Sequence, residues 1–260
     1  MPPPDVFQLV RYASPVGDLA AYVSVHQADD KKRPAIIWIV GGFPPGGFGI
    51  HLVSEAPTAN DQTAQAYRKA DVLTLFPSFR GAFGNPGLQE SFYGEVDDVI
   101  AALSYLKARN DVDPERVFLG GHSTSATLAL LAAAATDEFA GVFAFGPVSD
   151  PLMYGEEALH FDPADHEETR RRAPIHYLDS IRSETYVIEG EYGNIMALRG
   201  LELVSNNTNL KFVQIAGADH FQPLAPLNAL LAESIAGSRS GQRLGLEPAK
   251  MQASYSKARP

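Results

Sequence analysis

A serine set among small residues follows a predicted strand near the middle of the 260-residue chain, in the stretch LGGHSTSAT (residues 119–127). The apolar run from Arg116 to Leu119 is typical of a strand, and an Ala/Leu-rich helix pattern starts at Ser125. A sharp strand-to-helix turn exposes a serine Oγ in strained backbone geometry when the residues two before and two after are small, as Gly121 and Ser125 are. The sequence predicts Ser123 as a nucleophile. The motif alone also fits a turn with a helix-capping serine.

A serine nucleophile needs a base, and histidine is the most frequent one. Of the seven histidines, His220 follows the last predicted strand in the loop ADHF, and His122 is expected to point away from its neighbour Ser123. No two histidines have the spacing of a zinc-binding helix, and the chain has no cysteine, so we predict no metal site. His220 is the predicted base. The others, at a strand end, in loops or in an irregular segment, are His26, His51, His160, His166 and His176.

The acid that would orient the histidine is less clear. Ser123, a candidate acid and His220 occur in the chain order serine, acid, histidine at the ends of successive strands. Glu191 is the nearest carboxylate on the loop after the strand TYVIEG, and we choose it. Asp150, after the preceding strand, is the alternative. A Ser-His pair without an acid, or an inactive site, remains open.

The glycine-rich loop VGGFPPGG, residues 40–47, follows an earlier strand and could aim a backbone N–H at a developing oxyanion. We expect the N–H groups of Phe43 and Thr124 to form this oxyanion hole. The loop lacks the spacing of a nucleotide-binding loop, so no cofactor is predicted. A glycine- and proline-rich loop without a catalytic role is the alternative.

These residues need elements that bring them together. Opening strands are followed by alternating strands and helices, and parallel neighbours need helical crossovers, so the sequence predicts an α/β fold with a mostly parallel, doubly wound sheet covered by helices on both faces. Strands are expected at 7–14, 19–27, 35–40, 71–79, 116–119, 141–148, 185–190 and 210–217, and helices at 60–70, 94–110, from 125, 195–206 and 226–237. In the helix at 94–110, the apolar face is expected at Val96, Ile100, Leu103 and Leu106.

Two segments stand apart from this pattern. Residues 150–183 are irregular and of mixed charge, and we expect them to form a short lid that sets substrate choice. Residues 238–260 are basic and rich in Gly, Ser, Gln and Pro, which predicts a flexible C-terminal tail. Residues 1–237 would then be one domain.

The composition of the chain argues against some classes of binding partner. The formal net charge is −10 with scattered acidic residues, which argues against a nucleic-acid-binding surface. The longest apolar run, Ala126 to Ala135, is too short to cross a bilayer. The start of the chain shows no secretory signal, so we expect a cytoplasmic protein. The oligomeric state cannot be read from the sequence.

Several stretches in order resemble the α/β-hydrolase superfamily, in particular its prolyl-oligopeptidase and dienelactone-hydrolase-like branch. RPAIIWIVGGFP is similar to the strand that leads to the oxyanion loop, and FRGAFGNPG to an Arg-Gly loop. GEVDDVIAALSYL with VDPERVFLGGHS resembles the approach to the nucleophile, and RRRAPIHYLDSIRSETYVIEGE the segment before the acid strand. The likeness extends to about residue 237.

The resemblance implies that Ser123 is the nucleophile, His220 the base, and the N–H groups of Phe43 and Thr124 the oxyanion hole. The chain departs from the family at three positions. Gly41 stands where a histidine is usual, Ser125 stands where a glycine is usual, and the Gly-x-x-Asp pattern that starts at Gly190 places Gly193 where the acid should be. The last departure is the most serious, because a glycine cannot orient a histidine.

Together these features predict a serine hydrolase that cleaves a small carboxylic ester, and less readily an amide, through an acyl-enzyme. A peptidase of the prolyl-oligopeptidase type acting on short peptides is one alternative. A catalytically silent hydrolase fold used for binding is the other, suggested by Gly41 and Gly193.

Overall fold

The computed structural model describes residues 2–27, 29–43 and 56–258. Eight strands form one sheet in the order β1-β2-β4-β3-β5-β6-β7-β8. The pairs β1/β2 and β2/β4 are antiparallel and all others parallel, which confirms the predicted mostly parallel sheet. The strands are β1 (Phe7–Ser14), β2 (Gly17–Ser24), β3 (Arg33–Ile39), β4 (Leu73–Pro77), β5 (Val112–His122), β6 (Gly141–Phe145), β7 (Thr185–Gly190) and β8 (Leu210–Ile215).

The central strands are apolar throughout because both faces of the sheet are covered. Every residue of β3 is buried. Trp38 on β3 lies opposite Gly120 on β5, and a Cβ added at Gly120 would lie 2.6 Å from the indole ring. The glycine therefore makes room for the largest side chain of the core.

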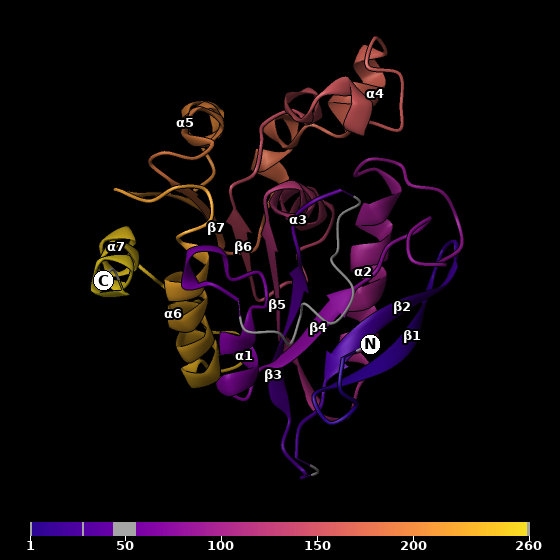
Figure 1. Cartoon of the computed structure of the whole chain (residues 1–260), viewed down its shortest axis with the longest axis vertical. Coiled ribbons are helices and arrows are strands. Elements are labelled where there is room, and N and C mark those ends of the chain that lie inside the picture. The colour runs from indigo at the N-terminus through magenta and orange to yellow at the C-terminus, as the bar shows by residue number, and fades with distance from the viewer. Residues whose placement is uncertain (1, 28, 44–55, 259–260) are drawn as a thin grey trace.

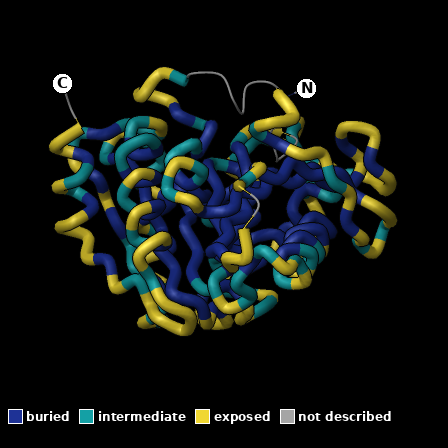
Figure 2. The backbone as a smooth tube through the Cα atoms, turned by 90° about the horizontal axis from the view of Figure 1, so that it is seen from below, coloured by how far each residue is buried: buried dark blue, intermediate teal, exposed yellow. Residues whose placement is uncertain are grey.

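Helices cover both faces of the sheet (Figure 1). Side chains of α2, α3 and α5 belong to one apolar cluster, and those of α1, α6 and α7 to a second cluster that lies apart from it. Figure 2 shows the buried sheet between layers whose outer surfaces are exposed. The helices are α1 (Gln65–Lys69), α2 (Gly94–Lys107), α3 (Thr124–Ala135), α4 (His166–Arg171), α5 (Ile195–Val204), α6 (Leu224–Gly237) and α7 (Pro248–Ala258).

The buried face of α2 is rotated from the predicted one. Leu103 and Leu106 are buried as expected, but Val96 and Ile100 are only partly buried. The carboxylate of Asp98 takes a place on the buried side, because it accepts hydrogen bonds from the main-chain N–H and the guanidinium of Arg80. An apolar pattern alone does not show a buried ion pair of this kind.

The expected flexible tail is an ordered segment that ends in α7, at least to residue 258. Leu246, Met251 and Tyr255 are buried in the second apolar cluster. The carboxylate of Glu184 accepts hydrogen bonds from the N–H groups of Leu244 and Gly245, which ties the linker before α7 to the start of β7. A few well-spaced apolar side chains thus order a segment whose composition is polar and basic.

The segment expected to be irregular, residues 150–183, holds α4 and short 3₁₀ turns, and in Figure 1 α4 stands at the upper edge of the molecule. Arg172 pairs with Glu168 and donates to the carbonyl of Glu90, so α4 is joined to the loop before α2. Its action as a lid stays a prediction. Among the residues described, none of the helices is both long and apolar enough to cross a membrane.

Candidate active site

Ser123 lies at the sharp turn between β5 and α3. Its backbone has φ 57° and ψ −121°, a combination that costs free energy for a residue with a side chain. The turn is held by the Ser123 N–H, which donates to the carbonyl of Phe145 on β6 at 2.7 Å. A Cβ added at Gly121 would lie 2.4 Å from the carbonyl oxygen of Ser125, so the position two residues before the serine has no room for a side chain.

Ser125 replaces the usual glycine at no evident cost to the turn. Its side chain is fully buried, and its hydroxyl donates a hydrogen bond of 2.7 Å to the carbonyl of Val40 at the end of β3. A buried hydroxyl with a partner avoids the penalty of an unsatisfied polar group. The departure at this position therefore adds a link between α3 and the oxyanion loop.

His220 lies on the loop between β8 and α6, and its ring lies beside the end of β6, to which the turn at Ser123 is also bonded. Its Nδ1 lies 2.9 Å from Oε2 of Glu189. Gly146, the residue after β6, has φ 69°, and a Cβ there would lie 2.3 Å from Cε1 of His220. Because the backbone of Ser123 is bonded to Phe145 and the ring of His220 lies against Gly146, the two residues lie at the same end of β6.

The carboxylate of Glu189 is fixed by three hydrogen bonds. It accepts from Gly190 N–H at 2.7 Å, from Asn194 N–H at 2.9 Å and from His220 Nδ1–H. The side chain is 1% exposed, so water does not compete for these bonds. A carboxylate in this position can hold the imidazole in the Nδ1–H tautomer, which leaves Nε2 with a lone pair.

Glu189 also accounts for Gly193. A Cβ added at Gly193 would lie 2.4 Å from Oε1 of Glu189 and 3.0 Å from Cα of His220. The carboxylate thus fills the space into which an aspartate at position 193 would project. The carboxylate comes from the strand rather than from the loop that follows it.

The structure does not join either carboxylate considered in the sequence to His220. Glu191, our choice, accepts a hydrogen bond from the Gly217 N–H at 2.7 Å. Asp150 accepts from the Leu152 N–H and begins a short turn. The expectation that Glu191 orients His220 is therefore corrected in favour of Glu189. The missed signal was a single carboxylate at the carboxyl end of an otherwise apolar, fully buried strand.

His122 is a neutral support of His220. Burial, with a smaller contribution from the nearby His220, lowers the pKa of His122 to about 3. Its Nε2–H donates to the carbonyl of His220 at 3.1 Å, and its Nδ1 accepts from the amide of Gln62 at 2.9 Å. The two rings lie 4.5 Å apart between centroids. A neutral His122 places no charge beside the ring of His220.

The same ring explains the glycine at position 41. A Cβ added at Gly41 would lie 2.9 Å from Nδ1 of His122 and 3.3 Å from Cβ of Ser123. A histidine at position 41, usual in the family that the sequence resembles, would collide with both. The imidazole of His122 occupies this region.

The loop after β3, which is expected to form the oxyanion hole, is tied to the start of α3 by the side chain of Thr124. The hydroxyl of Thr124 donates to Gly42 O at 2.7 Å and accepts from Gly42 N–H at 3.1 Å. The Gly42 N–H is thereby occupied, and the N–H groups of Phe43 and Thr124 make no hydrogen bond within the described part of the chain. The rest of the loop, residues 44–47, and the candidate His51 lie outside the described residues.

An aromatic cluster stands beside this loop. The ring of Phe43 lies 5.3 Å from that of Tyr154 and 6.0 Å from that of Phe92. The hydroxyl of Tyr154 is bonded to Thr127, one turn into α3. Phe43 is 41% exposed, so the cluster presents an apolar surface next to the expected oxyanion position. Within the described residues no group of acidic and histidine side chains could hold a metal ion.

The sheet order, the strained serine after β5 and the histidine after β8 define an α/β-hydrolase. The comparison with protein families agrees, since the prolyl oligopeptidase family matches residues 62–202, just over half of the chain. The chain belongs to the prolyl oligopeptidase family. This membership supports a serine hydrolase. None of the curated proteins matches the chain.

Solved structures share the fold at low identity. A 2,6-dihydroxy-pseudo-oxynicotine hydrolase is 14% identical with a TM-score of 0.65, and the match covers 88% of this chain and 67% of that one. The Pyrococcus horikoshii acylaminoacyl peptidase is 14% identical (TM-score 0.69; 94% and 44% covered). A Mycobacterium tuberculosis puromycin-hydrolyzing peptidase is 18% identical (TM-score 0.68; 93% and 40%). The chain thus spans under half the length of both peptidases.

Proposed function

We propose that the chain is a serine hydrolase that cleaves a carboxylic ester through an acyl-enzyme formed on Ser123. The observation that carries the proposal is the pair His220–Glu189 at the strand end beside the strained serine. Glu189 holds Nδ1–H, which leaves Nε2 as the proton acceptor for Ser123. The apo structure places no partner on the Ser123 hydroxyl among the described residues, and such hydrogen bonds often tighten only when substrate is bound.

The reaction proceeds in two balanced halves. His220 Nε2 takes the proton of Ser123 while Oγ bonds to the carbonyl carbon, and the resulting oxyanion faces the N–H groups of Phe43 and Thr124. The protonated His220 gives the proton to the alcohol oxygen as the ester bond breaks. Water then attacks the acyl-serine, its proton passing through His220 to Ser123, and the carboxylic acid leaves. Glu189 stabilises the imidazolium throughout without taking its proton.

The aromatic cluster supports an apolar acyl group. The ring of Phe43 is partly exposed, and Phe92 and Tyr154 pack against it. Burying apolar substrate area there lowers the free energy of the bound state by about 25 cal/mol per Å². We therefore expect the wild type to have a higher kcat/KM for p-nitrophenyl phenylacetate than for p-nitrophenyl acetate. In Phe43→Ala the two values of kcat/KM should be similar.

A matched pair of substitutions tests the assignment of the acid. Glu189→Gln leaves His220 without a charged partner, and we expect kcat to fall about 10⁴-fold. Glu191→Gln, on the loop that follows β7, keeps an oxygen that accepts from Gly217, so we expect less than a tenfold loss. Hydrolysis of p-nitrophenyl esters gives the rates, and labelling by a fluorophosphonate, absent in Ser123→Ala, reports the nucleophile. A folded wild-type protein with neither labelling nor turnover would establish the silent, binding role instead.

Amide cleavage is a second candidate, favoured by the family and by neighbours whose names describe peptidases. The same residues would serve it, because His220 can protonate a leaving amine as it protonates an alcohol. Parallel assays with an aminoacyl p-nitroanilide and the corresponding ester decide between the two. An amide kcat/KM that matches the ester value would make the chain a peptidase.

A further inference from the structure

The loop that carries His220 is held from outside by the C-terminal helix α7. Gln252 of α7 accepts a hydrogen bond from the Ala216 N–H at 2.8 Å, at the point where β8 ends. One turn further on, the hydroxyl of Tyr255 lies 3.0 Å from the carbonyl of Gly217 and 3.0 Å from Oε1 of Gln222. The helix therefore contacts the loop on both sides of His220.

Inside the loop, further hydrogen bonds join the residues that α7 contacts to the residues next to His220. Oε1 of Gln222 accepts from the Asp219 N–H at 3.1 Å. The carboxylate of Asp219 accepts from the N–H groups of Phe221 and Gln222, both at 2.8 Å. Gln222, which Tyr255 contacts, is thus bonded to Asp219 before His220, and Asp219 is bonded to Phe221 after it.

We propose that Tyr255 and Gln252 of α7 position the loop of His220, so that this helix sets the distance and angle between His220 and its partners. The inference rests on the proposed function, since it assigns positioning residues to that site. Neither side chain touches the reacting atoms. Their effect reaches the chemistry through Gly217, Gln222 and the turn between them.

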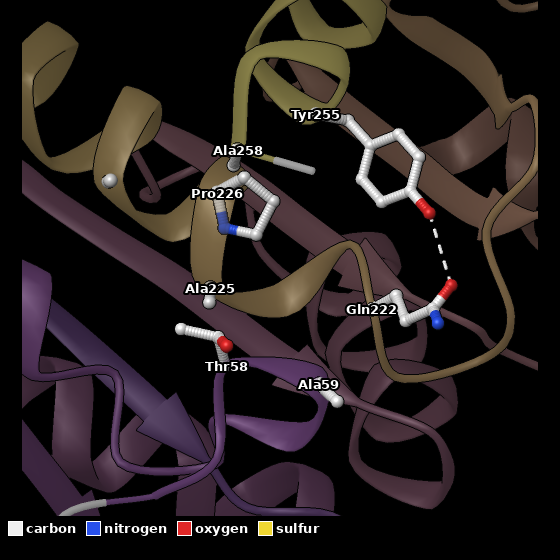
Figure 3. A pocket seen from close by; sticks show the side chains of 8 residues that line it. Thr58, Ala59, Gln222, Ala225, Pro226, Tyr255 and Ala258 are labelled. Atoms are coloured by element: carbon white, nitrogen blue, oxygen red, sulfur yellow. Dashed lines mark hydrogen bonds between the residues drawn. The ribbon is translucent and has the colours of Figure 1, made fainter. Parts of the chain in front are cut away.

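Met251 and Tyr255 pack α7 against the domain, and the hydrogen bonds of Tyr255 and Gln252 add a restraint on the loop itself. A cavity of about 750 Å³ lies beside the contact, between the 3₁₀ turn η2 (Thr58–Asn60), α6 and α7 (Figure 3). Apart from Tyr255 and Gln222, the described side chains around it are small or short: Thr58, Ala59, Ala225, Pro226, Ala229 and Ala258. Loss of the Tyr255 hydroxyl should therefore make the His220 loop more mobile, because the small side chains around the cavity cannot form contacts that replace its hydrogen bond.

The opposite side of the loop is tied more directly to the sheet. Gly217 N–H donates to the carboxylate of Glu191, and Tyr192 N–H donates to the carbonyl of Ala218. The loop is thus held between the end of β7 and α7. Without α7, we expect the loop to remain attached at one side and to move at the other.

Tyr255→Phe removes the contacts of the hydroxyl with Gly217 and Gln222, and Gln252→Leu removes the hydrogen bonds of Gln252 with Ala216, while both keep the size of the side chain. We expect each to lower kcat for a p-nitrophenyl ester about five- to tenfold with KM within twofold, because a small displacement of the base slows chemistry more than binding. We expect the amide hydrogens of Ala216 and Asp219 to exchange at least fivefold faster by NMR. Tyr67→Phe is the matched control, since it removes a buried hydroxyl bonded to Asn228 on α6, away from the loop.

Each outcome decides the proposal. Faster exchange in the loop with a lower kcat, in contrast to Tyr67→Phe, supports it. Unchanged exchange in both variants overturns it, and so does faster exchange with the kcat of the control. If the wild type hydrolyses no ester or amide, the proposed function fails, and the exchange rates alone then show whether α7 restrains the loop.

Discussion

The buried, neutral state of His122 has a consequence for stability that can be measured. Its pKa in the folded protein is about 3, against about 6.5 in an unfolded chain. Below pH 6.5 the unfolded chain therefore binds a proton that the folded protein does not bind. Because stability rises with pH wherever the unfolded state binds more protons, His122 makes the fold less stable as the pH falls from about 7 toward 3.

The size of the effect follows from the two pKa values. Between pH 7 and pH 5 the unfolded imidazole becomes almost fully charged while the folded one stays neutral, which lowers the free energy of unfolding by about 2 kcal/mol. Over the whole range down to pH 3 the loss is about 4 kcal/mol. The side chain is 1% exposed, so solvent screening is small.

His122→Gln isolates this contribution. The glutamine amide can still donate to the carbonyl of His220 but does not titrate. Urea unfolding at pH 7 and pH 5 should show that the variant loses about 2 kcal/mol less than the wild type over this interval. The exposed His176, replaced in the same way, should keep the wild-type dependence. An equal loss in His122→Gln and the wild type would refute a neutral, buried His122.

Two further substitutions test the packing of the site. Gly193→Ala places a methyl group 2.4 Å from Oε1 of Glu189. We therefore expect a large fall in kcat, approaching that of Glu189→Gln, with the melting temperature little changed. A fully active variant would contradict this geometry. Ser125→Gly removes a buried hydrogen bond and adds backbone freedom, and should cost about 1–2 kcal/mol in urea unfolding while most of the ester turnover remains.

The order of strands and helices could be predicted because burial on both faces gives a nearly continuous apolar run. The run AIIWIV and the strand TYVIEG both lie in the sheet where they were expected. Ser123 and His220 were found from the same order, since a residue directly after a parallel strand lies at the edge where active sites form. Their catalytic roles stay a proposal that the experiments above test.

The acid and the tail could not be predicted from the same patterns. Glu189 belongs to a strand whose side chains alternate between the two faces, and only its place at the carboxyl end lets its carboxylate reach His220. The order of residues 238–258 depends on Met251 and Tyr255 meeting an apolar surface built from distant segments. Composition averages over such contacts, and therefore favoured a flexible tail.

The two glycines that raised doubt about activity share one explanation. At Gly41 the room is taken by the ring of His122, and at Gly193 by the carboxylate of Glu189. His122 comes from the strand beside the one that leads to Gly41, Glu189 comes from the strand that leads to Gly193, and each contacts His220. A site that had lost its function would have no reason to keep both replacements bonded to the same histidine. The glycines therefore support an active site with its supporting groups relocated, rather than a silent one.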